Sequence, residues 1–195
     1  MILSNVSIHE ALDKGLLVLE PEPTPRFVKK GEPKCPYQTS SVDLRLGAEV
    51  AYFPEEGIPA QIDLRRGDFS KLFAPLAQTH VLSEQQPFVL QPRKFILAKT
   101  LERVHLRLTS DETSLAARVE GKSSYARCGL LVHFTAPTIH AGFEGTITLE
   151  LINFGPLPIA LYPEMPICQL IVEQVHGTPF SNESQFQGQS APGGG

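Results

Sequence analysis

Hydrophobic and polar residues follow a helical period only near the N-terminus of the chain. The stretch "SNVSIHEALDKGLL" predicts a short amphipathic helix, with Ser4 or Ser7 as its N-cap and Gly15 at its end. Residues 21–37 contain five prolines and show no sustained period. They predict a loop between the helix and the rest of the chain.

After this loop the pattern becomes that of short strands. Clusters of Gly, Pro, Asp or Ser separate runs that are apolar or alternate between apolar and polar residues. Many short strands with turn signals between them are typical of a β-barrel or β-sandwich. Two other stretches, "DFSKLFAP" and "SSYARCGL", predict helices of only a turn or two. The strand candidates are "SVDLRLGAEVAYF", "PFVLQ", "KFILAKTLERVHL", "SLAARVEG", "LLVHF", "GTITLELINFG" and "PIALYPEMPICQLIVEQV".

The candidate "GTITLELINFG" carries one carboxylate opposite a hydrophobic face. Successive side chains of a strand point to opposite faces, so Ile147, Leu149 and Leu151 share one side. Thr148 and Glu150 share the other side. In this position Glu150 is either an ordinary solvent-facing residue or a functional group.

The length and the tail bound the domain organisation. A chain of 195 residues is long enough for one sizeable core, so we predict a single domain over residues 1–178. Residues 179–195 are rich in Ser, Gln and Gly and cannot build a core by themselves. They form either a disordered end or an arm that becomes ordered over another part of the protein.

Charge and cysteine content exclude several classes of protein. The 17 basic and 21 acidic residues give a net charge of −4, which argues against a nucleic-acid polymer as partner but leaves room for a small anion. The chain shows neither a signal peptide nor a membrane span, so we expect a soluble, cytoplasmic protein without a membrane partner. Cys35, Cys128 and Cys168 are widely spaced, which indicates reduced thiols that act as small core residues.

Common catalytic motifs are missing from the sequence. Zinc-dependent nucleobase deaminases need His-x-Glu and Pro-Cys-x-x-Cys, and no histidine or cysteine here has that combined spacing. The sequence also lacks Gly-x-Ser-x-Gly, a Walker loop and Gly-x-Gly-x-x-Gly. We therefore expect no protein-bound metal and no zinc.

The stretch "GKSSYAR" could hold an anion. Gly121 frees the backbone, Lys122 and Arg127 supply two cations, and Ser123 and Ser124 add hydroxyl groups at the start of a short helix. Backbone N–H groups at a helix start favour anions, and a lysine with hydroxyls strengthens this preference for phosphate. A Lys-Ser-Ser turn is also common as a solvated helix cap.

The order of several motifs resembles that of the deoxycytidine triphosphate (dCTP) deaminase and deoxyuridine triphosphatase (dUTPase) superfamily, on the deaminase branch. The resemblance extends over nearly the whole chain. It implies a mainly β fold, a distorted jelly-roll barrel of the dUTPase-like type with a few short helices. It also implies a homotrimer whose active sites are shared between subunits. The motifs are "MILSNVSIHEAL", "QTSSVDLRLG", "LAKTLERVHL", "LAARVEGKSSYARCGLLVHFTA", "GFEGTITLELINFG", "MPICQLIVEQ" and "QFQGQ".

The resemblance assigns roles to the polar residues of this stretch. Glu150 would be the catalytic carboxylate that moves protons around the cytosine ring. Ser123 and the carbonyl of Ala136 would hold the attacking water, and Arg127 would lie close enough to Glu150 to keep it ionised. A metal is then not needed for the deamination itself.

The same resemblance predicts the nucleotide contacts. Lys122, Ser123 and Ser124 would bind the triphosphate, and Mg²⁺ would be carried by the triphosphate through water. The backbone of Thr148 and Leu149 would read the pyrimidine edge.

Other positions match the family pattern or depart from it. Gln169 and Gln189 match nucleotide-binding positions, with ordinary polar surface as the alternative. His140 stands where most relatives have an aspartate that contacts the 3′-hydroxyl, which weakens the case for pyrophosphate cleavage. Gln185 replaces a lysine, and Phe180 stands where a stacking tyrosine is common.

Three functions follow from the resemblance. The first is zinc-independent deamination of dCTP to dUTP and ammonia, which would feed dUMP and dTTP synthesis, with dUTP or dTTP as further nucleotide partners. The second is a dUTP diphosphatase or a bifunctional dCTP deaminase and diphosphatase. The third is a nucleotide-binding relative that has lost turnover.

Overall fold

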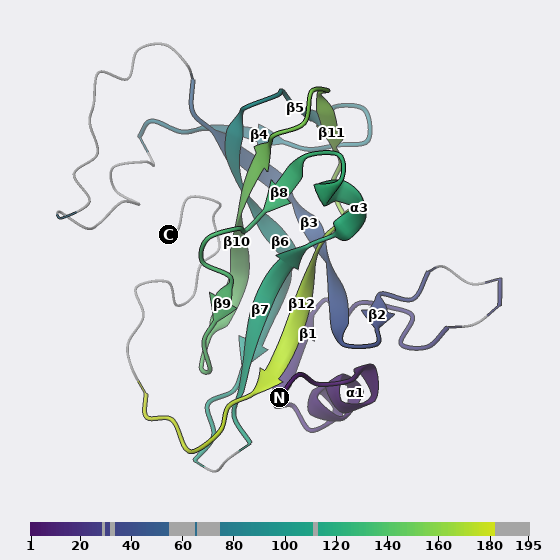
Figure 1. Ribbon diagram of the computed structural model, residues 1–195, viewed down its shortest axis with the longest axis vertical. Coiled ribbons are helices and arrows are strands. Elements are labelled where there is room, and N and C mark those ends of the chain that lie inside the picture. The colour runs from purple at the N-terminus through teal and green to yellow at the C-terminus, as the bar shows by residue number, and fades with distance from the viewer. Residues whose placement is uncertain (29, 32–33, 55–64, 66–74, 111–112, 182–195) are drawn as a thin grey trace.

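The computed structural model describes residues 1–28, 30–31, 34–54, 65, 75–110 and 113–181 (Figure 1). It is built mainly of strands. In chain order the elements are α1 (Asn5–Asp13), β1 (Leu17–Glu20), β2 (Tyr37–Gln38), β3 (Ser41–Tyr52), β4 (Gln78–Val81), β5 (Phe88–Leu90), β6 (Phe95–Leu106), β7 (Leu115–Gly121), α3 (Ser123–Ala126), β8 (Leu130–Val132), β9 (Thr138–Ile139), β10 (Glu144–Asn153), β11 (Ile159–Leu161) and β12 (Pro166–Gln174).

Within the described residues, ten strands form one antiparallel sheet. Its order is β8-β10-β6-β3-β12-β7-β9, with β1 added to β6 and with β2 and β4 added to β3. The long strand β3 joins the two halves, because its first part pairs with β12 and its second part pairs with β6. Figure 1 shows that these long strands cross at an angle and that the sheet is strongly twisted. β5 and β11 form a separate pair at one end.

The core lies inside the curled sheet and follows the strand period. In β10, Ile147, Leu149 and Leu151 are at most 2% exposed, whereas Thr148 and Glu150 lie half-buried on the other face. The predicted division of this strand into two faces is therefore confirmed. Full burial of each leucine stabilises the fold by about 1.5–3 kcal/mol, so a slip of one residue, which would expose both leucines, is strongly disfavoured.

The predicted N-terminal helix is present as α1. Ser4 is the N-cap, and its hydroxyl accepts a hydrogen bond from the backbone N–H of Ser7 at 3.2 Å. Ser7 is therefore inside the first turn and is not the cap. Gly15 follows the helix end with a φ of 65°, a conformation that glycine adopts without steric strain.

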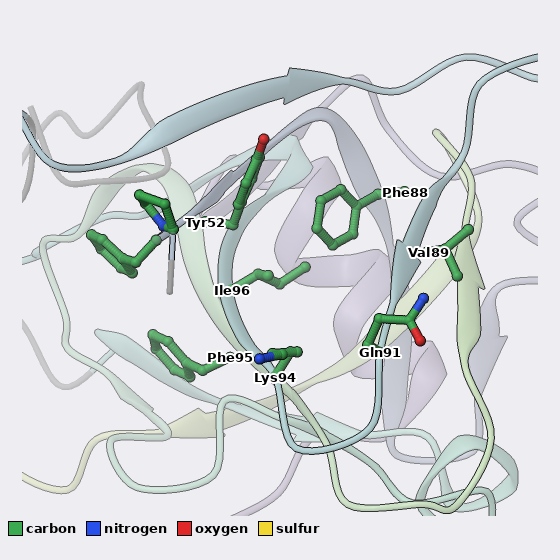
Figure 2. Close-up of a pocket in the computed structure, with 9 residues that line it drawn as sticks. Tyr52, Phe88, Val89, Gln91, Lys94, Phe95 and Ile96 are labelled. Carbon is green, nitrogen blue, oxygen red and sulfur yellow. The ribbon is translucent and has the colours of Figure 1, made fainter. Parts of the chain in front are cut away.

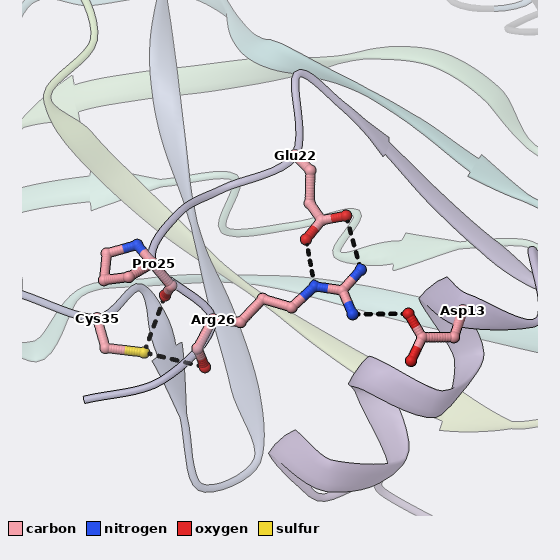
Figure 3. Close-up of polar contacts among 5 residues, drawn as sticks. All are labelled: Asp13, Glu22, Pro25, Arg26 and Cys35. Carbon is pink, nitrogen blue, oxygen red and sulfur yellow. Dashed lines mark hydrogen bonds and ion pairs between the residues drawn. The ribbon is translucent and has the colours of Figure 1, made fainter. Parts of the chain in front are cut away.

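The predicted proline-rich loop is fastened to α1 by one arginine (Figure 3). Arg26 donates hydrogen bonds to both carboxylate oxygens of Glu22 and one to Asp13 of α1. Nearby, the Cys35 thiol donates to the Pro25 carbonyl at 3.2 Å. These contacts hold the loop against α1 in the absence of regular secondary structure.

The structure differs from the predicted elements in several places. "PIALYPEMPICQLIVEQV" forms two strands, β11 and β12, because the chain turns at Pro163 and Glu164, where Glu164 has a φ of 60°. The short strands β1, β2, β4 and β9 were not predicted, since two to four residues are too few to show a period. Cys128 is exposed, unlike the buried Cys35 and Cys168.

Some expectations lie outside the described residues. The helix candidate "DFSKLFAP" does so except for its last proline, and so do Gln185 and Gln189 in the predicted C-terminal arm. The helices that the structure does describe are all too short or too polar to span a membrane.

Candidate active site

Glu150 forms the centre of the candidate site together with a histidine from the neighbouring strand. His133 directly follows β8, and its backbone N–H donates to the Glu150 carbonyl at 2.8 Å, extending the pairing of β8 with β10. Its Nδ1 lies 2.7 Å from Glu150 Oε2. The His133 side chain is 8% exposed and that of Glu150 is 31% exposed. The carboxylate is therefore held from one side and open to solvent on the other.

This environment favours the ionised form of Glu150. Burial by itself raises the pKa of the carboxyl group, but the hydrogen bond from His133 and the charge of its ring outweigh burial and lower the pKa. A carboxylate only accepts hydrogen bonds, so Nδ1 of His133 carries a proton. Nε2 of His133 is buried and has no partner within the described chain. Among the described residues, the His133 ring therefore hydrogen-bonds only to Glu150. The ionised Glu150 carboxylate can accept a proton.

At one edge of β10 the described pairing with β8 ends at Glu150. β8 pairs with β10 from Leu151 to Asn153, and Thr148 and Leu149 lie just beyond the end of this pairing. A β-bulge lies just before them, where the Ile147 N–H donates to the Thr100 hydroxyl at 2.9 Å. Backbone groups at such an edge can hydrogen-bond a planar ligand, which is the role expected of Thr148 and Leu149.

A second polar cluster surrounds Asp43, a buried residue of β3. Lys122 Nζ lies 2.6 Å from Asp43 Oδ2, and their side chains are 15% and 7% exposed. The Gln169 amide donates to Asp43 Oδ1 at 3.1 Å and to the Ser41 hydroxyl at 3.3 Å. The structure therefore brings together Lys122 and Gln169, two predicted nucleotide contacts, through a carboxylate that was not predicted.

The predicted α3 turn supplies exposed polar groups. Ser123 and Ser124 are exposed on its first residues, and Arg127 is exposed at its C-cap. Arg127 forms no ion pair with the described residues, and it comes three residues before Leu130, which pairs with Asn153. Asn153 lies three residues, or about 10 Å, along β10 from Glu150.

Within the described residues of one chain, His133 is the residue that pairs with Glu150 and lowers its pKa. The expected approach of Arg127 to Glu150 stays a prediction. The sequence placed Arg127 there by resemblance. Within the chain, strand register sets the actual partner of Glu150.

The remaining predicted residues do not join either cluster. Ala136 and His140 are exposed in the segments around β9, and Phe180 is 88% exposed beyond β12. The predicted water binding by Ala136 and the predicted nucleotide contacts of His140 and Phe180 stay predictions.

The sequence model of the dCTP deaminase-like family matches residues 2–175. The chain belongs to this family. It is 35% identical over 197 residues to "dCTP deaminase, dUMP-forming" of Methanosphaera stadtmanae, covering 98% of this chain and 91% of the relative. It is 38% identical over 197 residues to "dCTP deaminase" of Haloarcula marismortui, covering 98% of this chain and 92% of the relative.

A solved structure supports the fold class. The dCTP deaminase of Agrobacterium tumefaciens matches with a TM-score of 0.61 and 20% identity, over 90% of this chain and 48% of that chain. The chain therefore spans about half of that solved protein. The likeness confirms the predicted dUTPase-like β fold.

Sequence reasoning missed His133 and Asp43, although the sequence carried a signal for each. Asp43 is the acid in the motif "SVDLRLG", on the polar face of a strand that is otherwise hydrophobic. His133 ends the apolar run "LLV" and is a protonatable residue placed next to a family motif. Neither signal named a partner, because the partners are distant in sequence.

A separate cavity of about 250 Å³ lies between β3, β5 and β6 (Figure 2). Tyr52, Phe88 and Ile96 line it, and its lining includes no carboxylate and no histidine. Its described polar side chains are those of Tyr52, Gln91 and Lys94, so it lacks a carboxylate like that of Glu150.

Proposed function

We propose that this protein deaminates dCTP and that Glu150 transfers the protons. The observation that carries this proposal is the partly exposed carboxylate of Glu150, which His133 contacts at 2.7 Å and whose pKa this contact lowers. The names of the relatives from Methanosphaera stadtmanae and Haloarcula marismortui support dCTP as the substrate.

The chemistry needs one base that can also act as an acid. Glu150 removes a proton from water, and the resulting hydroxide attacks C4 of the cytosine ring. Glu150 passes this proton to N3, then takes the proton of the new C4 hydroxyl and delivers it to the amino group. The C4–N bond breaks as the C4 carbonyl forms, so that dCTP and water become dUTP and ammonia. His133 keeps Glu150 ionised at the start of this cycle, and backbone groups of Thr148 and Leu149 orient the base.

The triphosphate would bind near α3. Lys122, Ser123 and Ser124 provide one cation and two hydroxyls, and Mg²⁺ enters as part of the substrate, bound to the phosphate oxygens. Ser123 and the Ala136 carbonyl would hold the attacking water, and Arg127 would orient Glu150, as the family resemblance implies.

We infer that the working unit is a homotrimer. Within the described residues of one chain His133, and no arginine, forms an ion pair with Glu150, so we infer that a neighbouring chain brings an arginine to the carboxylate. Exposed apolar side chains near this region, Phe134 (47%) and Phe154 (63%), are suited to burial between subunits. Sedimentation velocity of the full chain tests this inference, and a monomer under conditions of full activity would contradict it.

A second candidate function is release of dUMP and pyrophosphate from the same substrate. The "dUMP-forming" name of the Methanosphaera stadtmanae relative favours it. His140 in place of an aspartate argues against it, because a neutral imidazole is a weaker choice for holding the attacking water at phosphorus. Deamination is common to both candidates, and they differ in whether the triphosphate is also cleaved.

One assay separates these functions. Purified protein is incubated with dCTP and Mg²⁺, and dUTP, dUMP and unchanged dCTP are resolved by chromatography. dUTP with ammonia supports the deaminase, and dUMP with pyrophosphate supports the bifunctional enzyme. Tight binding of dCTP without any product would show a protein that has lost turnover, and the proposal would fail.

A further inference from the structure

Asp43 has both carboxylate oxygens engaged by residues of the candidate nucleotide site. Oδ2 is 2.6 Å from the Lys122 ammonium, and Oδ1 accepts from the Gln169 amide at 3.1 Å. Asp43 lies directly opposite Gln169 in the β3–β12 register, and Lys122 follows the β7 residue Gly121, which lies opposite Cys168. Lys122 therefore reaches across β12 to an acid on the second strand along.

This arrangement fixes which atom Gln169 offers to a ligand. An ionised carboxylate only accepts hydrogen bonds, so the NH₂ group of Gln169 must face Asp43. The second N–H of the same NH₂ group donates to the Ser41 hydroxyl at 3.3 Å. Both donors of the amide are used, and its Oε1 accepts no hydrogen bond from the described residues. Gln169 consequently presents an acceptor.

The same carboxylate neutralises part of the Lys122 charge. The ammonium has three N–H donors, and one of them is directed to Asp43 in a largely buried ion pair. The remaining donors can still reach an anion, but the attraction of the anion to Lys122 is opposed by the negative charge of Asp43 a few ångströms away. Asp43 thus limits phosphate affinity while it holds Lys122 in place.

We propose that Asp43 is a positioning residue of the nucleotide site. It orients the Gln169 amide so that the amide oxygen accepts a hydrogen bond from a donor of the bound nucleotide. It also lowers the affinity of Lys122 for phosphate. The group that Gln169 reads is a hydroxyl, an amine or a bound water, and not a bare phosphate oxygen, because phosphate oxygens only accept. This inference rests on the proposed function only in one respect, the identity of the nucleotide.

The substitution Asp43→Asn separates the two effects. The new side-chain amide has one oxygen for Lys122, so its NH₂ group faces Gln169, and the Gln169 amide must turn its oxygen inward and its NH₂ outward. The loss of one negative charge should tighten binding of inorganic tripolyphosphate roughly threefold to tenfold at low ionic strength. The reversed amide should lower kcat/KM for dCTP by about tenfold, the effect of one mismatched polar contact. If Asp43 had only a structural role, its substitution would weaken tripolyphosphate binding and lower kcat/KM together.

The double substitution Asp43→Asn with Gln169→Glu is the matched rescue. It exchanges the acid and the amide, so the net charge is kept and residue 169 again offers an oxygen to the ligand. Both the tripolyphosphate affinity and kcat/KM should return to within about threefold of the unsubstituted chain. Gln169→Glu alone places two carboxylates face to face and should lose activity.

Glu173→Gln is the control for charge. Glu173 also lies on β12 and accepts from Arg118 Nε at 2.7 Å, in a pair further along β7 from Lys122. Its substitution removes one negative charge from the strand next to that of Asp43 and should leave tripolyphosphate affinity unchanged.

Calorimetric titration of the full chain with tripolyphosphate needs no turnover, so it decides the role of Asp43 even if the chain does not deaminate dCTP. Weaker tripolyphosphate binding in folded Asp43→Asn, no rescue by the double substitution, or no tripolyphosphate binding at all would overturn the inference. If Asp43→Asn alone does not fold, the double variant carries the test, with near-normal affinity in its support and lost affinity in a folded protein against it.

Discussion

Removal of the His133 imidazole should shift the pH range in which the enzyme works. His133→Ala deletes the donor 2.7 Å from Glu150 Oε2, whereas His133→Asn keeps an N–H group near the position of Nδ1. Asparagine also tolerates the positive φ of 51° that His133 adopts. His133→Asn therefore keeps both a donor and a suitable backbone residue, whereas His133→Ala removes the donor and fits the positive φ less well. A loss from backbone strain is the same at all pH values, and a loss from the hydrogen bond is confined to acid pH.

The size of the effect follows from the exposure of the pair. A hydrogen bond to a charged group contributes about 1.5–3 kcal/mol. Glu150 is 31% exposed, so solvent screening favours the lower end of this range. About 1.5 kcal/mol corresponds to a roughly tenfold change in the ratio of ionised to protonated Glu150. The sign is that of a lowered pKa, so loss of His133 raises the pKa and reduces the ionised fraction at acid pH.

The assay is the pH dependence of kcat with saturating dCTP and Mg²⁺. For His133→Ala the acid limb should move to higher pH, so that the rate at the acid midpoint of the unsubstituted enzyme falls about fivefold beyond any loss seen at high pH, and about tenfold well below that midpoint. His133→Asn should stay close to the original profile. An unchanged acid limb in His133→Ala would show that another group ionises Glu150, and the reasoning would be wrong.

Other substitutions test the remaining steps. Glu150→Gln should lower kcat for ammonia release by at least about 10²-fold to 10⁴-fold with little change in the urea unfolding midpoint, since an amide cannot shuttle protons; retained ammonia release would rule out Glu150 as the shuttle. Glu102 is fully buried and accepts hydrogen bonds from the Arg45 backbone N–H and guanidinium. Glu102→Ala should therefore lower the free energy of unfolding by about 3 kcal/mol, and Glu102→Gln should lower it by less. Equal urea midpoints for the two variants would contradict this account. Thr100→Val should leave the Ile147 N–H without its acceptor and cost about 1–3 kcal/mol in the same urea measurement, with Thr100→Ser as the control that keeps the hydroxyl.

Local chemistry decided much of the fold. The alternation of "GTITLELINFG" identified the buried and open faces of β10, because side-chain direction in a strand depends only on position along it. Ser4 and Gly15 likewise marked the ends of α1 through backbone groups a few residues away. Short strands such as β9 escaped prediction because pairing with β7, and not their own sequence, makes them strands.

The candidate site shows the same division. The sequence, through its resemblance to a family, singled out Glu150, Lys122 and Gln169, and the structure brings Lys122 and Gln169 to a common carboxylate. It did not foresee His133 as the partner of Glu150, since a resemblance names residues but not which of them touch in one chain.

The sequence by itself determined the mainly β character of the chain, the open face that carries Glu150 and the family to which its motifs belong. Tertiary structure alone decided the partners: His133 for Glu150 across 17 residues, and Asp43 for Gln169 across 126 residues. The physical reason is that periodicity and capping act over a few neighbouring residues, whereas hydrogen bonds and ion pairs act over about 3 Å of space. Strand register brings such distant residues to that distance, and short-range patterns along the chain do not specify the register between strands so far apart.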